Sequence, residues 1–273
     1  MGCYDNGERT PPLDGRPGVL PERLMKNADS YLVGRKGPVP AILAYFYPDD
    51  PRGLKRWEDM VRRHLRPNSA VLDAGCGRGR DEFDLQGACA MSVGLDPSPE
   101  IQHNPWVRHR LRGDLHFLPF SDGSFDVVIA SNVLEHLGQP GKVFAEVSRV
   151  LREGGKFIFV TPNKTHYSSL IARSTPLWFH RWANARIGIA EEDVFPKFYR
   201  ANTRAKLQSL ANSAQLKLEQ WDLFECCPGN LAIVWPAFLL GCIYGWIIQR
   251  FRMLAGLRAQ IRAVFVKAPG PQI

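Results

Sequence analysis

The chain has 273 residues, of which 45% are hydrophobic and 23% are charged, and its formal net charge at pH 7 is +8. This is a globular composition with room for one α/β domain and a cap, or for two small domains. The positive charge would suit nucleic acid, an acidic membrane face or anionic substrates, but no motif typical of RNA or DNA binding accompanies it. We therefore expect no nucleic-acid partner.

The six cysteines form no CxxC pair and have no spacing typical of metal ligands. Most of them lie in apolar segments, which is typical of buried free thiols in a reducing compartment. The cysteine pattern therefore predicts a cytoplasmic protein.

Composition divides the chain into three parts. Residues 1–22 are rich in proline, glycine and charge, which predicts a poorly ordered tail. Residues 23–52 read as an N-terminal arm or lid, in which the apolar segment 41–48 either packs the arm onto the domain or covers a site. Packing is the interpretation we favour for that segment. Residues 53–273 are predicted to form the main domain, and it opens with an amphipathic helix because its first apolar residues keep helical spacing.

A strand, an acid and three glycines follow one another in residues 70–80, AVLDAGCGRGR. The apolar run ends at Asp73, and Gly75, Gly77 and Gly79 come next. Glycine tolerates positive φ and has no Cβ, so a ligand can lie against this backbone. The segment lacks the lysine of a P-loop, and an arginine stands where a dinucleotide fingerprint has its third glycine. The acid suits a ligand with a cation such as an α-amino group; the alternative is a tight turn that binds nothing.

Polar side chains also end three later strands. Asp96 closes the predicted strand 91–96, where it suits a contact to ribose hydroxyls or caps the following turn. Asp114 follows a short strand and could accept a hydrogen bond from an exocyclic amine. Asn132 follows the strand predicted over 125–130. Because parallel strands end at one edge of a sheet, these groups are expected to share a crevice with Asp73.

Four segments in order resemble the successive motifs of class I S-adenosylmethionine-dependent methyltransferases, namely VLDAGCGRGR, VGLDPSP, GDLHFLPFSDGSFDVVIASNVLEHL and LREGGKFIFVTPN. The closest resemblance is to the small-molecule group of type 11 enzymes, which includes the quinone methyltransferases. It covers residues 53–165. It implies an α/β fold with a Rossmann-like, seven-stranded sheet and helices on both faces, and S-adenosyl-L-methionine as the cofactor.

The same resemblance assigns roles around that cofactor. Asp73 would lie near the ammonium group, and Asp96 would bind the ribose. The adenine would be read by Asp114 and by the backbone at Leu115. The whole set of cofactor-binding residues that it implies is Asp73, Gly75, Cys76, Gly77, Asp96, Asp114, Leu115 and Asn132.

No single residue is diagnostic of a catalytic base. His136 is one candidate, with a packing role as the alternative, and His166 with Tyr167 follows the fifth strand at the expected lip of the crevice. Some methyltransferases bind a divalent metal with Glu-x-x-Glu-His at the position of His136. In this chain Asn132 replaces the first glutamate of that pattern and Glu135 keeps the second, so a metal would lose a carboxylate ligand and we expect none.

Residues 164–200 read as a cap insertion because many aromatic residues gather there outside the sheet. They would enclose an apolar substrate, pack into a small helical core, or do both. The aromatic residues and the histidine of this segment that carry the prediction are Trp178, Phe179, His180, Trp182, Phe195, Phe198 and Tyr199.

An uncharged stretch over residues 231–248 has the length of a minimal membrane span. Its flanks, 216–225 and 262–268, read as neighbouring antiparallel strands, so the stretch must leave and return on the same side of the sheet. We therefore expect an apolar helix over 231–255 that lies on the body of the protein, on a membrane surface or in a homodimer contact. The arginines that follow it would suit an anionic leaflet.

Together these features predict an enzyme that methylates a small, largely apolar acceptor, with oxygen favoured because O-methylation is frequent in the family. One alternative is C- or N-methylation of a quinone or lipid-linked acceptor. Another is a non-catalytic interaction module that keeps the fold, against which the intact Asp73, Asp96 and Asp114 speak. Methylation of nucleic acid is a further alternative, and it would make substrate binding steeply salt-dependent.

Overall fold

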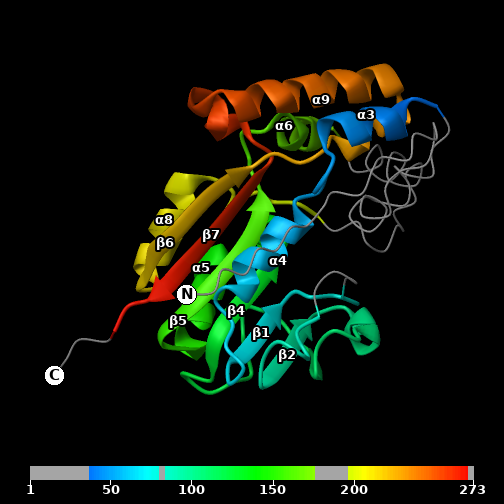
Figure 1. Cartoon of the computed structure of the whole chain (residues 1–273). Coiled ribbons are helices and arrows are strands. Elements are labelled where there is room, and N and C mark those ends of the chain that lie inside the picture. Colours follow the sequence, from blue (N-terminus) through cyan, green and yellow to red (C-terminus); the bar gives the residue numbers. More distant parts are fainter. Residues whose placement is uncertain (1–36, 80–83, 176–195, 270–273) are drawn as a thin grey trace, which may run out of the picture.

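The computed structural model describes residues 37–79, 84–175 and 196–269. The predicted tail 1–22, much of the predicted arm, and most of the aromatic residues of the predicted cap lie outside these ranges. Helices cover a central sheet, and one further layer of helices lies across an end of that sheet (Figure 1).

Seven strands form one sheet in the order β3-β2-β1-β4-β5-β7-β6. The first five strands run parallel, whereas β7 is antiparallel to both β5 and β6. The predicted seven-stranded sheet is confirmed. Its strands are β1 (Ala70–Ala74), β2 (Met91–Asp96), β3 (His109–Arg112), β4 (Phe125–Ser131), β5 (Leu151–Pro162), β6 (Leu216–Phe224) and β7 (Gln260–Lys267).

The strand bounds differ from the sequence prediction mainly in β5. It begins at Leu151, because that residue pairs with Phe125 before a bulge shifts the register to Val127 and Lys156. The predicted pairing of the two C-terminal strands is confirmed, since β6 and β7 are antiparallel neighbours.

Both faces of the sheet are covered by helices, as the fold class predicts. Successive residues of a strand point to opposite faces. In β1, Leu72 belongs to the core under α5 and α8, whereas Val71 belongs to the core under α4. The described α-helices are α3 (Val39–Phe46), α4 (Leu54–Arg62), α5 (Pro140–Val150), α6 (Tyr167–Ser174), α8 (Arg204–Ser213) and α9 (Trp235–Arg250), and the 3-10 helices are η1 (Pro99–His103), η2 (Leu134–His136), η4 (Gly229–Ile233) and η5 (Arg252–Leu257).

A third, smaller core joins α3 to α9, which lie side by side in Figure 1. Val39 and Leu43 of α3 meet Phe238 and Cys242 of α9 there. The apolar segment before Pro48 therefore packs onto the apolar C-terminal helix.

The register of the sheet fixes where α9 lies. Gln260 pairs with Pro162 at the end of β5 and also with Phe224 at the end of β6. The segment between β6 and β7 therefore leaves and returns at the edge where the parallel strands end, as the sequence predicts. None of the helices in the described ranges is both long and apolar enough to span a bilayer.

A buried arginine ties the start of α4 to the sheet. Arg262 of β7 is almost wholly buried, and its Nη2 donates to the carbonyl oxygen of Gly53 at 2.8 Å. Its guanidinium carbon lies 4.3 Å from the centre of the Phe224 ring. Gly53 has a φ of 70°, and a Cβ there would overlap both of these side chains.

This packing predicts that Gly53→Ala is far more destabilising than Gly154→Ala. Gly154 has the same φ of 70°, but nothing lies within 4 Å of where its Cβ would be. The left-handed backbone should cost about 1 kcal/mol at either position, and overpacking should raise the cost at Gly53 to about 3 kcal/mol. Urea unfolding of the two variants measures the difference, and equal losses would contradict the packing argument.

Candidate functional site

The glycine loop after β1 is fixed from two sides. The Gly75 N–H donates to the carbonyl oxygen of Leu95 at 2.7 Å, which anchors the loop on β2. Gly75 has a φ of 76°, and a Cβ there would lie 2.5 Å from Val133 Cγ2 in the segment after β4. Gly77 also has a positive φ, but nothing lies within 4 Å of its Cβ direction. The loop is therefore tightly packed at Gly75 and has an open face at Gly77, where a ligand could lie against the backbone.

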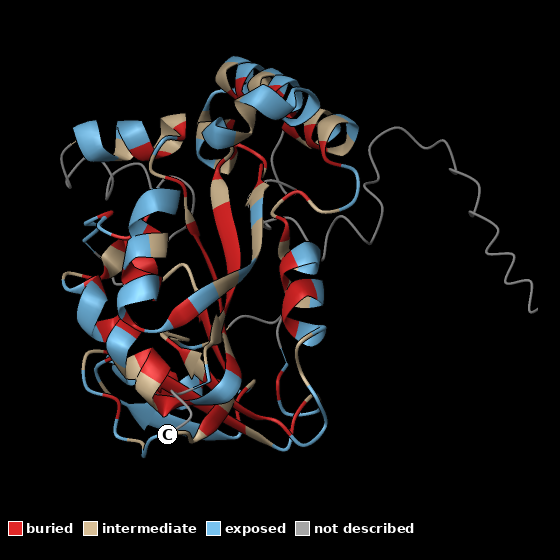
Figure 2. Cartoon of the chain, turned by 90° about the vertical axis from the view of Figure 1, so that its left-hand side faces the viewer, coloured by how far each residue is buried: buried red, intermediate tan, exposed pale blue. Residues whose placement is uncertain are grey.

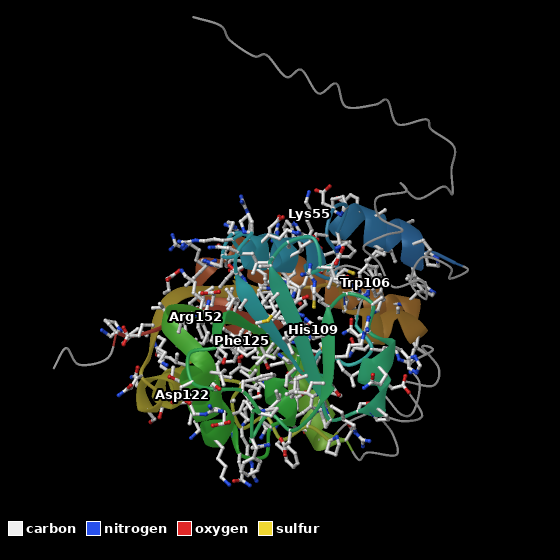
Figure 3. The ribbon with its side chains drawn as sticks, turned by 90° about the horizontal axis from the view of Figure 1, so that it is seen from below. Lys55, Trp106, His109, Asp122, Phe125 and Arg152 are labelled. Carbon is white, nitrogen blue, oxygen red and sulfur yellow. The ribbon has the colours of Figure 1, made fainter. Side chains whose placement is uncertain are left out.

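Asn104 and Trp106 also contact the glycine loop, and no sequence motif pointed to either residue. The Asn104 side chain donates to the Gly77 carbonyl oxygen at 3.3 Å. A Cβ on Gly79 would lie 2.6 Å from Trp106 Cδ1, and Trp106 is labelled in Figure 3. On the β2 side, a Cβ on Gly94 would lie 2.7 Å from Cys76 Sγ. Burial, together with Asp73, raises the pKa of the Cys76 thiol, so this side chain stays neutral and acts in packing.

Asp96 connects the loop to the end of β2. Its Oδ2 accepts a hydrogen bond from the Gly77 N–H at 2.9 Å, and its Oδ1 accepts one from the Ser98 N–H at 2.8 Å. Each carboxylate oxygen has room for more than one donor. Asp96 can therefore hold the loop and also accept hydrogen bonds from a ligand's hydroxyl groups.

Asp73 is the unsatisfied charge of the site. It lies partly buried near the end of β1, and no hydrogen bond or ion pair reaches its carboxylate from the described residues. Burial, and then the negative charge of Asp96, raise the pKa of Asp73 to about 7. A buried carboxylate without a partner is costly. A ligand cation placed here would remove that cost, which is the fit expected for the α-amino group of an amino-acid cofactor.

Asp114 and Leu115 follow β3 with very different environments. The Asp114 carboxylate is largely exposed and accepts from the His116 N–H at 2.9 Å and from the His116 ring at 2.6 Å. The backbone hydrogen bond from His116 is the main cause of the lowered pKa of Asp114. Leu115 is buried in the core, so only its backbone can face a ligand.

Asn132 takes an unusual backbone conformation just after β4. Its φ is 55°, a left-handed value that asparagine tolerates better than most residues. Its N–H donates to the Val160 carbonyl oxygen at 2.8 Å, which holds the segment against β5. The turn at Asn132 thereby places Val133 over Gly75. The sheet and this turn together bring Asp73, Asp96 and Asn132 to one edge of the sheet.

His136 lies at the end of a short helix beside a buried acid. Its Nδ1 is 2.8 Å from the Pro196 carbonyl oxygen, and its Nε2 is 3.8 Å from Glu135 Oε1. This side chain is partly exposed, whereas Glu135 is only 2% exposed. Because a carbonyl oxygen can only accept, Nδ1 carries a proton, and Nε2, which faces Glu135, is the nitrogen left to take up a second one. The role of His136 in proton transfer stays a prediction.

Glu135 belongs to a buried polar network that sequence reasoning missed. Thr161 Oγ1 donates to Glu135 Oε2 at 3.1 Å, and Asn202 Nδ2 donates to Thr161 Oγ1 at 2.7 Å. The Glu135 carbonyl oxygen accepts from the N–H groups of Phe198 and Tyr199. Burial raises the pKa of Glu135. The network fastens the last residues of the predicted cap, and Asn202 just after it, to the end of β5. The sequence showed only an acid in an apolar context.

His166 lies deeper than the lip position that the sequence suggested. It is 3% exposed, its Nδ1 is 2.7 Å from Ser168 Oγ, and its Nε2 is 3.4 Å from Glu225 Oε1. Tyr167 and Tyr244 of α9 pack against its ring. Burial raises the pKa of Tyr167, which therefore stays a phenol. Both ring nitrogens of His166 thus face protein groups, and its role and that of Tyr167 in proton transfer remain predictions.

Comparison with known proteins matches this architecture to one family. Residues 72–159 match the family model described as a methyltransferase domain. Within these residues the chain carries a class I methyltransferase domain. Its cofactor is S-adenosylmethionine. The matched residues include the glycine loop and the ends of β2, β3 and β4, so the family match and the crevice coincide.

Individual relatives agree with the family. A protein of Mycolicibacterium smegmatis named a probable S-adenosylmethionine-dependent methyltransferase is 35% identical over 133 residues, which are 45% of this chain and 50% of the relative. A malonyl-[acyl-carrier protein] O-methyltransferase of Herminiimonas arsenicoxydans is 39% identical over 99 residues, which are 35% of this chain and 38% of the relative. The chain therefore matches half or less of the length of these curated relatives.

A solved structure supports the fold over a larger share of the chain. A SAM-dependent methyltransferase from Methanosarcina mazei superposes with a TM-score of 0.50 and 15% identity, and covers 77% of this chain and 98% of that one. At this identity the likeness concerns the fold alone. The family match covers residues 72–159, whereas the likeness in fold extends over more of the chain.

The alternative metal site would lie at Asn132, Glu135 and His136. Across residues 37–79, 84–175 and 196–269, no three His, Cys, Asp or Glu side chains converge as metal ligands would. The Glu135 carboxylate instead accepts a hydrogen bond from the Thr161 hydroxyl. The turn at Asn132 places Val133 over the glycine loop.

The buried network predicts that Glu135→Gln raises the stability of the methyltransferase at neutral pH. The folded-state pKa of Glu135 lies above its unfolded value, so its favourable contribution is present at low pH and is lost as the pH rises through the folded-state pKa. A glutamine stays neutral and can still accept from Thr161. We expect a higher melting temperature than the wild type at pH 8 and no gain at pH values below about 4.5.

Thermal melts from acid to neutral pH measure this effect. Glu153→Gln near the start of β5 is a matched control, because Glu153 is exposed. A Glu135→Gln variant that is less stable than the wild type at every pH would show that the charged form of Glu135 is needed in the fold.

Proposed function

We propose that this methyltransferase transfers the methyl group of S-adenosylmethionine to a small, largely apolar acceptor, with oxygen as the preferred acceptor atom. The observation that carries the proposal is the unpartnered, partly buried Asp73 carboxylate beside the open face of the glycine loop. Methyl transfer itself requires no acid at this position, whereas a cofactor with a positively charged α-amino group requires a negatively charged partner.

The cofactor would lie across the ends of β1, β2 and β3. In this proposal Asp73 pairs with the ammonium group, the backbone of Gly75, Cys76 and Gly77 lies against the amino-acid portion, and Asp96 accepts from the ribose hydroxyls. Support comes from the lone pairs that Asp96 keeps beyond its bonds to Gly77 and Ser98.

The adenine and sulfonium ends would lie farther along the crevice. Asp114 would accept from the exocyclic amine of adenine with the carboxylate oxygen that His116 leaves unused, and the backbone of Leu115 would meet the ring. Asn132 would lie near the sulfonium, at the left-handed turn that follows β4.

The cofactor supplies an activated methyl group, so the chain has to align the acceptor and take up one proton. We assign the proton to His136 or His166. Each of these histidines has a carboxylate beside its Nε2, Glu135 at 3.8 Å and Glu225 at 3.4 Å. A histidine can take up a proton near neutral pH, which is the step that the transfer requires. His136 is the first choice because it is the more exposed of the two.

An apolar acceptor fits the surroundings of the crevice. The layer formed by α3, α6 and α9 lies at the edge where the parallel strands end, and its own core is apolar (Figure 1). Among the relatives, one is named as an O-methyltransferase, and a Caenorhabditis elegans relative of 31% identity over 46% of either chain is named as a sterol 4-C-methyltransferase. C-methylation, or N-methylation, of a quinone or lipid-linked acceptor is therefore the second candidate.

Transfer of a labelled methyl group tests the acceptor class. The protein is incubated with methyl-labelled S-adenosylmethionine and either a phenol and quinol panel or an aqueous metabolite extract. Label should enter the organic phase, and NMR of the product tells an O-methyl from a C- or N-methyl group. Label that appears only in water-soluble products would contradict an apolar acceptor, and a C-methyl product would replace the oxygen preference.

The pKa of Asp73 predicts how cofactor binding depends on pH. The cation should bind the ionised carboxylate, and the ionised fraction grows as the pH rises through about 7. Cofactor affinity should therefore rise by roughly tenfold between pH 6 and pH 7.5. In Asp73→Asn the affinity should fall at neutral pH and its dependence on pH should flatten.

Calorimetric titration of S-adenosylmethionine across this pH range measures both effects. Asp222→Asn is the control, because Asp222 is an exposed acid on the edge strand β6, away from the crevice. If Asp73→Asn binds the cofactor as the wild type does at every pH, Asp73 does not hold the ammonium group.

A further inference from the structure

The outer face of α9 leaves a row of large apolar side chains in solvent. We define this face by Trp235, Leu240, Ile243, Trp246 and Ile247, all of which are exposed, and Leu240 is 68% exposed. Their spacing places them on one side of the helix, opposite the side that packs on α3. Figure 2 shows that the helices at the end of the sheet carry exposed residues on their outer side. The helix is thus apolar on both sides, although only one side has a protein partner among the described residues.

The apolar surface continues past the end of α9 into η5. Phe251 is half exposed and Met253 is 89% exposed. Two tryptophans and a phenylalanine spread over this length are typical of side chains that settle at a membrane–water boundary. Exposed apolar surface of this extent marks an interaction site.

Positive charge borders the same surface. Arg250 and Arg252 are exposed, and neither has an ion pair within the described part of the chain. No aspartate or glutamate follows Glu225 in the sequence. A cavity of about 300 Å³ lies at this end of α9, lined by Phe46, Tyr47, Cys242, Trp246, Gln249 and Arg250. A phosphate group would find an arginine and aromatic side chains there.

We propose that the outer face of α9 and η5 docks the protein on the surface of an anionic phospholipid bilayer, with the helix lying in the plane of the membrane. Apolar side chains would enter the acyl boundary while Arg250 and Arg252 meet lipid phosphates. A second copy of the chain is the less favoured occupant, because the same segment of a partner would offer these arginines no carboxylate.

Docking in this orientation has a consequence for the crevice. The segment between β6 and β7 lies at the edge where the parallel strands end, since Gln260 pairs with both Pro162 and Phe224. The bilayer would therefore lie on the side of the molecule where the crevice opens. An acceptor dissolved in the membrane could reach the site without crossing bulk water. This consequence rests on the proposed function, whereas the docking itself does not.

Flotation of the full-length protein with lipid vesicles tests the docking. Vesicles of pure phosphatidylcholine are compared with vesicles that contain about one third phosphatidylglycerol. The wild type should float with the anionic vesicles. Leu240→Glu should lower this partition by at least about tenfold, and Arg250→Gln combined with Arg252→Gln should lower it by about thirtyfold.

Phe117→Glu is the matched control. Phe117 is 71% exposed and follows β3, at the opposite edge of the sheet from β6, so the same new charge should leave flotation unchanged. Titration with S-adenosylmethionine reports whether each variant is folded and keeps the cofactor site, independently of lipid.

Failure of the wild type to float, or flotation that Leu240→Glu leaves unchanged, would overturn the docking. A wild type that does not float and is a dimer by light scattering, while Leu240→Glu is a monomer, would assign the face to a second copy instead. Cofactor binding that persists in these outcomes would leave the proposed function standing.

Discussion

The parallel pairing of β1 with β2 on one side and with β4 on the other is the constraint on which the site depends. At β1 the order of strands reverses direction, which is where open α/β sheets bind their ligands. The pairing brings the glycine loop against Leu95 and against Val133, and it aligns the ends of three strands at one edge. The loop can then present its backbone at Gly77, because its other contacts are already made.

Two carboxylates in this small space explain why the crevice is prepared for a charged ligand. Asp96 is satisfied by the N–H groups of Gly77 and Ser98, whereas Asp73 has no donor among the described residues. The charge of Asp96 and burial together disfavour the ionised form of Asp73. A cation that enters next to Asp73 relieves both effects, so electrostatic strain in the free protein becomes affinity in the complex.

The sequence predicts the parts of the molecule whose signal is local. The apolar runs that end in Asp73 and Asp96 have nearly the predicted bounds as strands, and the uncharged C-terminal stretch returns to the sheet as its flanks predicted. Contacts between segments that are far apart in the chain could not be predicted from the sequence. His166 was expected at the lip of the crevice, but Glu225 and α9, far along the chain, enclose it. The Glu135 network and the support of Gly77 by Asn104 likewise depend on folding, because one polar residue in a sequence does not name its partner.

The central claim is that the ends of β1 and β2 hold the amino-acid and ribose parts of S-adenosylmethionine. A crystal structure of the protein with S-adenosylhomocysteine bound tests it most directly, since this product keeps both groups. The account predicts the ammonium group within about 3 Å of the Asp73 carboxylate and the ribose hydroxyls within about 3 Å of Asp96. A product molecule that lies elsewhere, or that leaves Asp73 without a cation, would contradict it.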